Sequence, residues 1–357
     1  MNNLKKLGVT ALAGSLAAVS AQAGEMSMNG SANMTYYTTS KSEGKGIGTD
    51  KGLTVSGSGE LDNGWTFSIY TYFSDALGIS THATSLTMGS MGTIKAGQAF
   101  GGNSTSYDEE VPQAYEQTSD RQQNSANQVG NWMDNGGLVW IPPALDIGGA
   151  SVQAHVGFSP DANDVATNNG SVGAKPAGTT WGQGRDLGVT ISTDAGLTLG
   201  AYVAERENEY PLTGAAAVRD EFNASWYAKY TMGSVSVGYS QAYYDSGTAA
   251  AGTAATTAKA IGTSDGVFEN EQMSIAFNVN DNLSISYTES VDTYDAQSHS
   301  SSGTEIADVD QETEALQAAY SMGGMTIKAF QMEASNPGWD SNATKNTFSE
   351  ISIGLSF

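Results

Sequence analysis

The amino-acid sequence predicts an all-β fold, a 16-stranded antiparallel β-barrel that spans a membrane. Apolar and polar residues alternate with a period of two in sixteen short segments between about residue 25 and the end of the chain. Tight turns and long polar connections alternate between these segments. The last segment keeps its alternation to the final residue, because Ile351, Ile353, Leu355 and Phe357 are all apolar. A strand that ends in this way is expected to close the barrel.

The N-terminal residues are expected to form a signal peptide. Lys5 and Lys6 precede a run of apolar and small residues, and Ala21-Gln-Ala23 matches a cleavage site. The run is short for a membrane anchor and is interrupted by Gly8 and Gly14. We therefore predict a cleaved signal peptide at 1–23 and one β-barrel domain at 24–357.

The composition fits a barrel with a wet interior. Only 39% of the residues are hydrophobic and 43 are glycine, which disfavours a large soluble core. The chain has no cysteine, so no disulfide can stabilise it. The formal net charge of -23 argues against nucleic acid as a partner. A low apolar content suffices if one face of each strand meets lipid and the other meets water.

The strands follow one another as hairpins. Asp62-Asn-Gly64 supplies positive-φ residues for a tight turn between the strands 53–60 and 65–70. The other expected strands lie at 25–40, just before Ser90, and at 93–98, 138–141, 152–158, 187–192, 197–203, 222–230, 235–240, 273–277, 283–288, 316–320, 325–330 and 350–357.

The connections at the opposite ends are long, acidic and rich in Gly, Ser, Thr and Asn. They include 41–51, 99–135, 159–184, 207–220, 245–266, 292–311 and 334–345, whereas 75–82 is short. Outer-membrane barrels have this asymmetry, with short periplasmic turns and long outer loops. A soluble sandwich or solenoid would also alternate, but its connections have no reason to alternate so strictly.

The two faces of the expected strands differ in character. Inward positions such as Ser284, Ser286 and Thr288 are small and polar, which leaves room for a water-filled lumen in a barrel of sixteen strands. Aromatic residues near the strand ends are expected to form girdles at the membrane interfaces: Tyr36, Trp65, Phe73, Trp140, Phe158, Trp226, Tyr230, Tyr243, Tyr287 and Tyr320.

Over essentially the whole of 24–357, the chain resembles the trimeric general diffusion porins of Gram-negative outer membranes. Gly89-Ser-Met-Gly-Thr-Ile-Lys-Ala-Gly-Gln98 is similar to the hairpin before the third loop of these porins, and Phe357 is similar to their terminal aromatic residue. Asp120-Arg-Gln-Gln-Asn-Ser125, followed by Val139-Trp-Ile-Pro-Pro143, resembles the stretch that leaves the loop. The Pro-Glu-Phe-Gly motif of enterobacterial members is absent.

The resemblance implies a third loop that folds into the barrel and narrows it. The residues implied at this constriction are Asp108, Glu109, Glu110, Glu116, Asp120 and Arg121. The basic side chains implied on the lumen wall are Lys95, Lys229 and Lys328. Because acids outnumber bases, we expect mild cation selectivity. The alternatives are a substrate-selective channel on the same barrel and a soluble secreted carbohydrate-binding β-protein.

The resemblance also implies several partners. We expect outer-membrane lipid, two further copies in a homotrimer, small hydrophilic solutes and ions, and the barrel-assembly machinery, which would read Phe357 during insertion.

Signals for catalysis or cofactors are weak. His82, His155 and His299 have no metal-ligand partner at usable spacing. Gly262-Thr-Ser-Asp-Gly266 matches G-x-S-x-G, but no strand-to-helix elbow follows. Asp308, Asp310 and Glu312 could hold a divalent cation weakly, although the glycine turn of a calcium loop is missing. We therefore expect neither an enzyme nor a cofactor.

Overall fold

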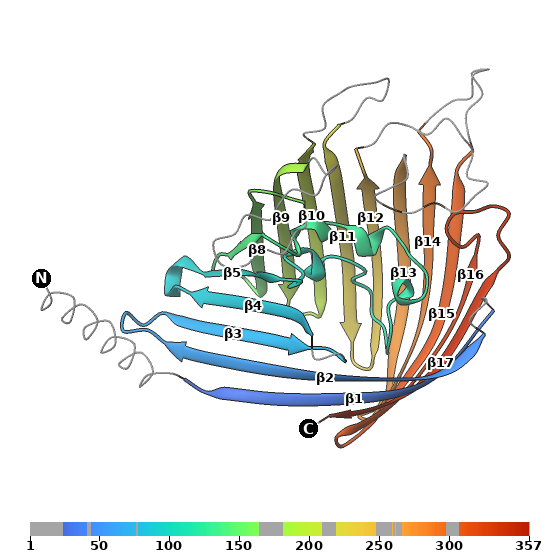
Figure 1. The fold of residues 1–357 in the computed structure, drawn as a ribbon, viewed down its shortest axis with the longest axis horizontal. Coiled ribbons are helices and arrows are strands. Elements are labelled where there is room, and N and C mark those ends of the chain that lie inside the picture. Colours follow the sequence, from blue (N-terminus) through green and yellow to red (C-terminus); the bar gives the residue numbers. More distant parts are fainter. Residues whose placement is uncertain are drawn as a thin grey trace, which may run out of the picture.

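The computed structural model describes residues 24–40, 44–75, 78–163, 181–208, 219–247, 259, 261, 266–297 and 307–356. Within them the chain forms a single antiparallel sheet of seventeen strands that closes on itself, because β1 pairs with β2 on one side and with β17 on the other (Figure 1). The strands are β1 (Met26–Thr39), β2 (Lys45–Glu60), β3 (Thr66–Phe73), β4 (Ile79–Thr87), β5 (Thr93–Gln98), β6 (Leu138–Ile141), β7 (Leu145–Ile147), β8 (Ala150–Ser159), β9 (Trp181–Thr193), β10 (Leu197–Asn208), β11 (Glu221–Met232), β12 (Val235–Asp245), β13 (Val267–Asn280), β14 (Leu283–Asp295), β15 (Val309–Met322), β16 (Met325–Ser335) and β17 (Asn346–Ser356).

Strands β6 and β7 are two halves of one interrupted strand of the barrel. Both pair with β8, and the prolines Pro142 and Pro143 separate them. Proline has no N–H to give to the ladder, so the pairing breaks there. The side chain of Gln153 donates to the carbonyl of Pro142 at 2.7 Å. Counted together, β6 and β7 make sixteen strand positions around the barrel, so the predicted number of sixteen is confirmed. The turn expected over 142–149 is shorter than predicted, because 145–147 belongs to β7.

The predicted asymmetry of the connections is also confirmed. Two- to five-residue turns join strands at one end, as at Gly233-Ser234 between β11 and β12, while the long connections lie at the other end. The long connection expected at 41–51 is wrong, because 45–51 belongs to β2 and only 40–44 joins it to β1. Gly233 and Gly323 lie at these turns with φ of 61° and 60°, values that glycine adopts without strain.

Apolar side chains cover much of the outer surface of the barrel, as the period-two pattern predicts. Exposed apolar side chains alternate with buried or lumen-facing ones along the strands, for example Ile275, Phe277 and Val279 on β13. Closure pairs the backbone groups of every strand, which a sheet in hydrocarbon requires. The soluble sandwich or solenoid alternative is therefore not the fold that the structure has.

The inner wall differs from the prediction of small polar residues alone. Large aromatic side chains also point inward on β10–β17, and they are almost completely buried: Tyr202, Tyr227, Tyr244, Phe268, Tyr294, Phe330 and Phe348. Loops folded into the barrel cover them. Near the loop end, Trp339 packs on Phe268 at 4.7 Å between ring centroids and donates to the carbonyl of Asp292 at 2.9 Å.

Among the described residues, no helix has the length and apolar character needed to cross a membrane.

Candidate functional site

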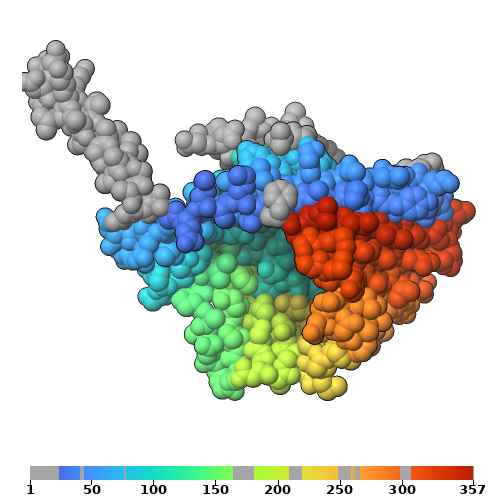
Figure 2. All heavy atoms as spheres, turned by 90° about the horizontal axis from the view of Figure 1, so that it is seen from below, coloured from blue at the N-terminus to red at the C-terminus, as the bar shows by residue number. Residues whose placement is uncertain are grey.

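The candidate site is the 99–137 connection between β5 and β6, called the inner loop below. It carries four short 3-10 helices, η2 (Ser104–Ser106), η3 (Thr118–Asp120), η4 (Ala126–Gln128) and η5 (Asn131–Met133). In Figure 1 it is the teal segment that crosses in front of strands β8 to β15 at mid-height. Figure 2 looks into the barrel from below, where the blue β1–β3 wall borders a hollow with teal atoms deeper inside it.

The two ends of the inner loop are tied to each other. The backbone N–H of Gly101 donates to Asp134 Oδ1 at 2.5 Å, and the N–H of Ala99 donates to Asn135 Oδ1 at 2.9 Å. Phe100 packs with Ala83 in a buried cluster beneath this junction. The inner loop therefore leaves and rejoins the wall at one place, and it ends where β6 begins.

Side chains of the inner loop are seated on glycines of the wall. The ring of Tyr107 lies where a Cβ on Gly188 would be, and the ring of Trp132 lies over Gly184 in the same way. Tyr107 also stacks on Tyr202, with 5.1 Å between the ring centroids. These inward glycines of β9 give the loop room to lie directly on the backbone of the sheet.

Hydrogen bonds also attach the inner loop to the barrel wall. Tyr107 is hydrogen-bonded to His155 Nδ1 of β8 at 2.5 Å. Further along, the N–H of Ala114 donates to Ser286 Oγ at 2.9 Å, and the N–H of Ser125 donates to Asp292 Oδ2 at 2.6 Å. From β8 to β15 the inner loop is therefore attached to strands that are far apart in the sequence.

Glu109 is buried beneath the inner loop and is 3% exposed. Its carboxyl group accepts hydrogen bonds from Asn124 Nδ2 at 2.7 Å and from the hydroxyl of Ser119, and Gln272 Nε2 lies at 3.4 Å. Burial raises the pKa of Glu109, while these donors lower it. The sequence placed Glu109 at a constriction; the structure instead places it between loop and wall, where it fixes the conformation of the loop.

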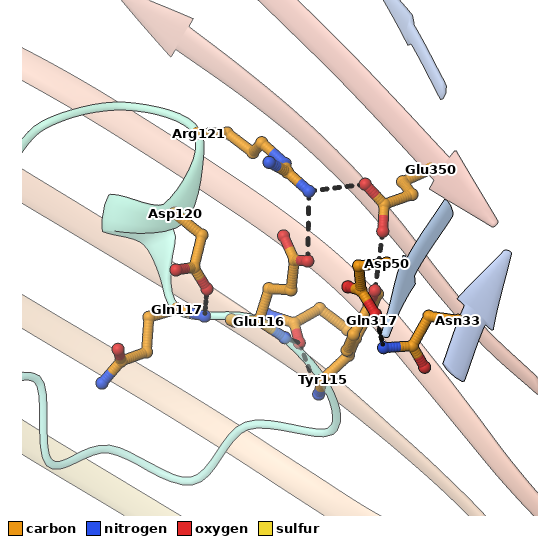
Figure 3. Close-up of polar contacts among 9 residues, drawn as sticks. All are labelled: Asn33, Asp50, Tyr115, Glu116, Gln117, Asp120, Arg121, Gln317 and Glu350. Carbon is orange, nitrogen blue, oxygen red and sulfur yellow. Dashed lines mark hydrogen bonds and ion pairs between the residues drawn. The ribbon is translucent and has the colours of Figure 1, made fainter. Parts of the chain in front are cut away.

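Arg121 joins the tip of the loop to the last strand (Figure 3). It donates to Glu116 Oε1 at 3.2 Å and to Glu350 Oε2 at 2.5 Å. The hydroxyl of Tyr115 donates to the other oxygen of Glu350 at 2.6 Å, and the N–H groups of Tyr115 and Glu116 both donate to Gln317 Oε1. Burial raises the pKa of Glu116 to about 7, although Arg121 lowers it. Sequence reasoning named Arg121 and Glu116 but missed Glu350.

Lys229 and Glu110 lie in direct contact. The ammonium group of Lys229, on β11, forms an ion pair with Glu110 Oε2 of the inner loop. The resemblance implied acids and bases facing each other across the lumen. Here the two charges meet on the same side of the lumen, because Lys229 belongs to the part of the wall that the loop covers.

The other two lysines lie against aromatic rings. Lys95 Nζ is 5.2 Å from the centroid of the Phe100 ring, and Lys328 Nζ is 4.6 Å from that of Tyr115. Both rings belong to the inner loop. All three predicted lysines thus line the inner wall, and each contacts the loop rather than facing it from a distance.

The remaining two predicted acids differ in role. Asp120 Oδ2 accepts the N–H of Gln117 at 2.8 Å and thereby caps η3. Asp108 is partly buried, and its pKa is raised to about 7, first by burial and then by the neighbouring Glu109 and Glu110.

The wall of β1–β5 carries few charges on its inner face. Its inward positions are mainly Ser, Thr, Asn and Gly, and its charged residues are Asp50, Glu60 and Lys95. Asp50 accepts a hydrogen bond from Asn33 at 2.8 Å. A basic cluster of the kind that the resemblance implied is not present on this wall.

The proposed divalent-cation residues do not form a site. Asp310 and Glu312 are exposed alternate residues on the outer face of β15, and Asp310 accepts the hydroxyl of Thr293 at 2.7 Å. Asp308 precedes the strand. In the part of the chain that the structure describes, no group of three or more His, Cys, Asp or Glu residues could hold a metal.

Some predicted features lie outside the described residues. These are the signal peptide 1–23, Phe357, His299 and residues 262–265 of the G-x-S-x-G match.

Comparison with solved structures identifies the architecture. An OmpF structure from Salmonella typhi, in complex with daunomycin, is 12% identical, covers 94% of this chain and 98% of its own, and superposes with a TM-score of 0.67. The chain has the porin fold. An anion-selective porin from Comamonas acidovorans is 14% identical, with 93% and 99% coverage and a TM-score of 0.62.

A third porin-fold neighbour is OmpT of Vibrio cholerae in its trimer form, which is 12% identical, with 94% and 100% coverage and a TM-score of 0.61. No family model and no curated protein matches the sequence. The porin fold therefore rests on the structure, and the activity must be argued from the residues of the site.

Proposed function

We propose that the protein is an outer-membrane porin, a water-filled channel for the passive diffusion of ions and small hydrophilic solutes. The observation that carries the proposal is the inner loop, which is attached by its own side chains to the inner wall of a closed barrel. A barrel with sixteen strand positions is wide enough to hold a water channel. A loop fixed inside it narrows the passage without closing it, so solutes are selected by size.

We propose that the constriction is formed by the inner loop, with Asp108, Glu110, Glu116 and Asp120 as its acids and Lys95, Lys229 and Lys328 as the basic wall. Glu109 and Arg121 belong to it as residues that hold the loop in place. No covalent chemistry and no cofactor are part of this function.

Mild cation selectivity is proposed from the charges. Glu110 compensates Lys229, and Glu116 and Glu350 together more than compensate Arg121. Asp50 of β2 adds a carboxylate beside the tip of the loop. Rings and walls of excess negative charge favour cations. The porin fold itself does not fix the sign, since one neighbour is described as anion-selective.

A homotrimer is proposed from the outer face of β2–β5. Thr49, Lys51, Thr71, His82 and Gln98 share this face, and Thr71 Oγ1 is hydrogen-bonded to His82 Nδ1 at 3.2 Å. Polar groups of this kind are costly against hydrocarbon and are better covered by protein. The trimer form of the Vibrio neighbour fits an assembly of three.

Export and insertion are proposed as the sequence suggests. Residues 1–23 would be cleaved as a signal peptide, and Phe357 would be read by the barrel-assembly machinery of a Gram-negative outer membrane.

Planar-bilayer recording of the detergent-purified protein tests the function. We expect stepwise conductance, closures in groups of three, and a zero-current potential in a KCl gradient that favours potassium. A protein that stays monodisperse without detergent and gives no conductance would overturn the channel. A potential that favours chloride would overturn the selectivity alone.

A further inference from the structure

A second connection, residues 336–345 between β16 and β17, is also held on the inner wall of the barrel; it is the red loop at the right of Figure 1. Its anchor is Trp339, which is 0% exposed. The indole ring packs on Phe268 with 4.7 Å between the ring centroids, and Tyr294 lies beside Phe268 at 5.1 Å. The three rings belong to one buried cluster at the loop end of β13 and β14.

The backbone of this connection is strained at two positions. Trp339 has a φ of 53° and Asn336 a φ of 46°, in the left-handed region that bulky residues rarely adopt. Such a conformation persists only where the surrounding contacts determine it. Here Asn336 Nδ2 donates to the carbonyl of Asp310 at 2.8 Å, and Trp339 Nε1 donates to the carbonyl of Asp292 at 2.9 Å. The strain therefore indicates that the position of the connection is closely specified.

Asp292 is bonded to both this connection and the inner loop. Its carbonyl accepts the indole N–H of Trp339, while its carboxylate Oδ2 accepts the N–H and the hydroxyl of Ser125 at 2.6 and 2.8 Å. Asp292 is 1% exposed, so both sets of contacts are shielded from water. One wall residue thus joins Trp339 to the inner loop.

Gln311 joins the same two segments a second time. It lies opposite Asp292 in the register of β14 and β15 and is also 1% exposed. Its Oε1 accepts the N–H of Gly338 and Nε2 of Gln122, both at 2.7 Å, and its Nε2 donates to the carbonyl of Gln123 at 2.7 Å. A carboxamide oxygen has two lone pairs, and both are used here, so the amide is fixed in one orientation. Gly338 therefore helps to orient the group that holds Gln122 and Gln123.

We propose that Trp339 is a positioning residue for the constriction, and that residues 336–345 support residues 122–125 of the inner loop through Asp292 and Gln311. The inference rests on the proposed channel function and assigns part of the control of its narrowest region to a second loop. Residues 122–125 follow Arg121 at the loop tip directly, and Gln123 is exposed, so the supported stretch borders the passage.

Site-specific thiol labelling of the full mature protein in detergent tests the support. The sequence has no cysteine, so one introduced thiol reports on one place. Ala126→Cys places it in η4 beside Ser125, where Ala126 is 2% exposed. Ala83→Cys places it on β4 beneath Phe100, at the base of the inner loop, where Ala83 is 1% exposed. A charged methanethiosulfonate reaches a buried thiol when the structure opens locally, so its rate follows the open population.

Variants of Trp339 are then compared in the two backgrounds. Trp339→Ala should raise the labelling rate of Ala126→Cys about fivefold, the effect of weakening one buried hydrogen-bonded contact, and should leave that of Ala83→Cys unchanged. Trp339→Phe keeps a ring against Phe268 but lacks the N–H, so its rate should be intermediate. Trp181→Ala is the matched control, because the Trp181 ring lies over Arg206 at 3.9 Å, and it should change neither rate.

Two results would overturn the proposal. An equal rise at both thiols would show general loosening of the barrel, and an unchanged rate at Ala126→Cys would show that the two loops are independent. If Trp339→Ala gives no folded barrel, Trp339→Phe decides the question by the same comparison of the two thiols.

Current recording links the support to the passage and separates this inference from the channel function. The open-channel noise of Trp339→Ala should exceed that of the wild type and of Trp181→Ala, and unchanged noise would overturn the link to the constriction. Labelling needs no current, so a selective rise at Ala126→Cys in a protein without conductance would support the contact between the loops and reject the channel alone. Normal conductance with unchanged labelling would reject the support and leave the channel intact.

Discussion

Arg121 of the inner loop donates a hydrogen bond of 2.5 Å to Glu350 of β17, a residue whose side chain is 3% exposed. This contact fixes the loop tip to the strand that closes the barrel. Removing the guanidinium group would leave a buried carboxylate with Tyr115 as its remaining hydrogen-bond partner in Figure 3.

We predict that Arg121→Ala destabilises the protein by about 2 kcal/mol, because an uncompensated buried charge is costly while Arg121 itself is partly exposed. Thermal unfolding in detergent measures the change. Arg185→Ala is the control, since its pair with Glu205 at 2.9 Å is largely exposed and should contribute less than about 1 kcal/mol. Equal losses in both variants would contradict a special role for the loop contact.

The seat of Tyr107 on Gly188 gives a second prediction. A methyl group at residue 188 would occupy the space of the Tyr107 ring, so Gly188→Ala should displace the loop and cost about 1–3 kcal/mol. The rate of proteolysis within the loop and the noise of the open-channel current both measure how far the loop detaches from β9. Gly57→Ala, where the added methyl group has nothing within 4 Å, should leave both unchanged.

The pair formed by Lys229 and Glu110 predicts opposite changes in ion selectivity. Lys229→Gln leaves Glu110 uncompensated, which should shift the zero-current potential further toward potassium. Glu110→Gln leaves Lys229 uncompensated and should shift it toward chloride. Shifts of the same sign in the two variants would show that neither charge faces the permeation path.

The pKa values of Asp108 and Glu116, both raised to about 7, predict a pH-dependent selectivity. As the pH falls from about 8 to about 6, both groups take up protons and the lumen loses negative charge, so the preference for potassium should decline. Asp108→Asn combined with Glu116→Gln should flatten this dependence. A wild-type potential that stays constant over this range would contradict the prediction.

The same two acids affect stability with a definite sign. Their folded-state pKa values lie above the ordinary values of 3.8 and 4.5, so the folded chain binds these protons more tightly than the unfolded chain does. Their burial therefore destabilises the fold at high pH, and this cost decreases as the pH falls from about 7 toward the ordinary values. The double variant should therefore reduce the fall in unfolding temperature as the pH rises from about 4 to about 7.

Much of the barrel could be predicted from the sequence, because lipid imposes a local rule on every strand. Residues such as Ile275 and Phe277 must be apolar wherever they lie along the barrel, and turns such as Gly233-Ser234 must be tight. The interruption that divides one strand of the barrel into β6 and β7 was not predicted. Its signal was visible in Pro142-Pro143, which cannot supply the N–H groups of a continuous ladder.

The attachment of the inner loop could not be predicted in the same way. It depends on which loop residue meets which strand, as Arg121 meets Glu350 across 229 positions of sequence, and local pattern does not contain that pairing. Glu109 shows the consequence, because a loop acid and a buried anchor look alike in sequence. The glycines at inward positions of β9, Gly184 and Gly188, were a readable sign that another segment lies against that wall.

The hydrogen bonds and ion pairs of the inner loop described above end on β8–β17, and only Phe100 at the base of the loop packs on β3 and β4. The rest of the inner face of β2–β4, which carries Ser, Thr and Gly together with Tyr72, is left as the free side of the passage. The aperture is thus eccentric, and its two banks are built independently of each other. Bulkier residues on β2–β4 would narrow the passage, and smaller ones would widen it, without weakening the hydrogen bonds that hold the loop. Evolution, or an engineer, can therefore retune what passes by editing strands that carry none of the hydrogen-bonded anchors of the loop.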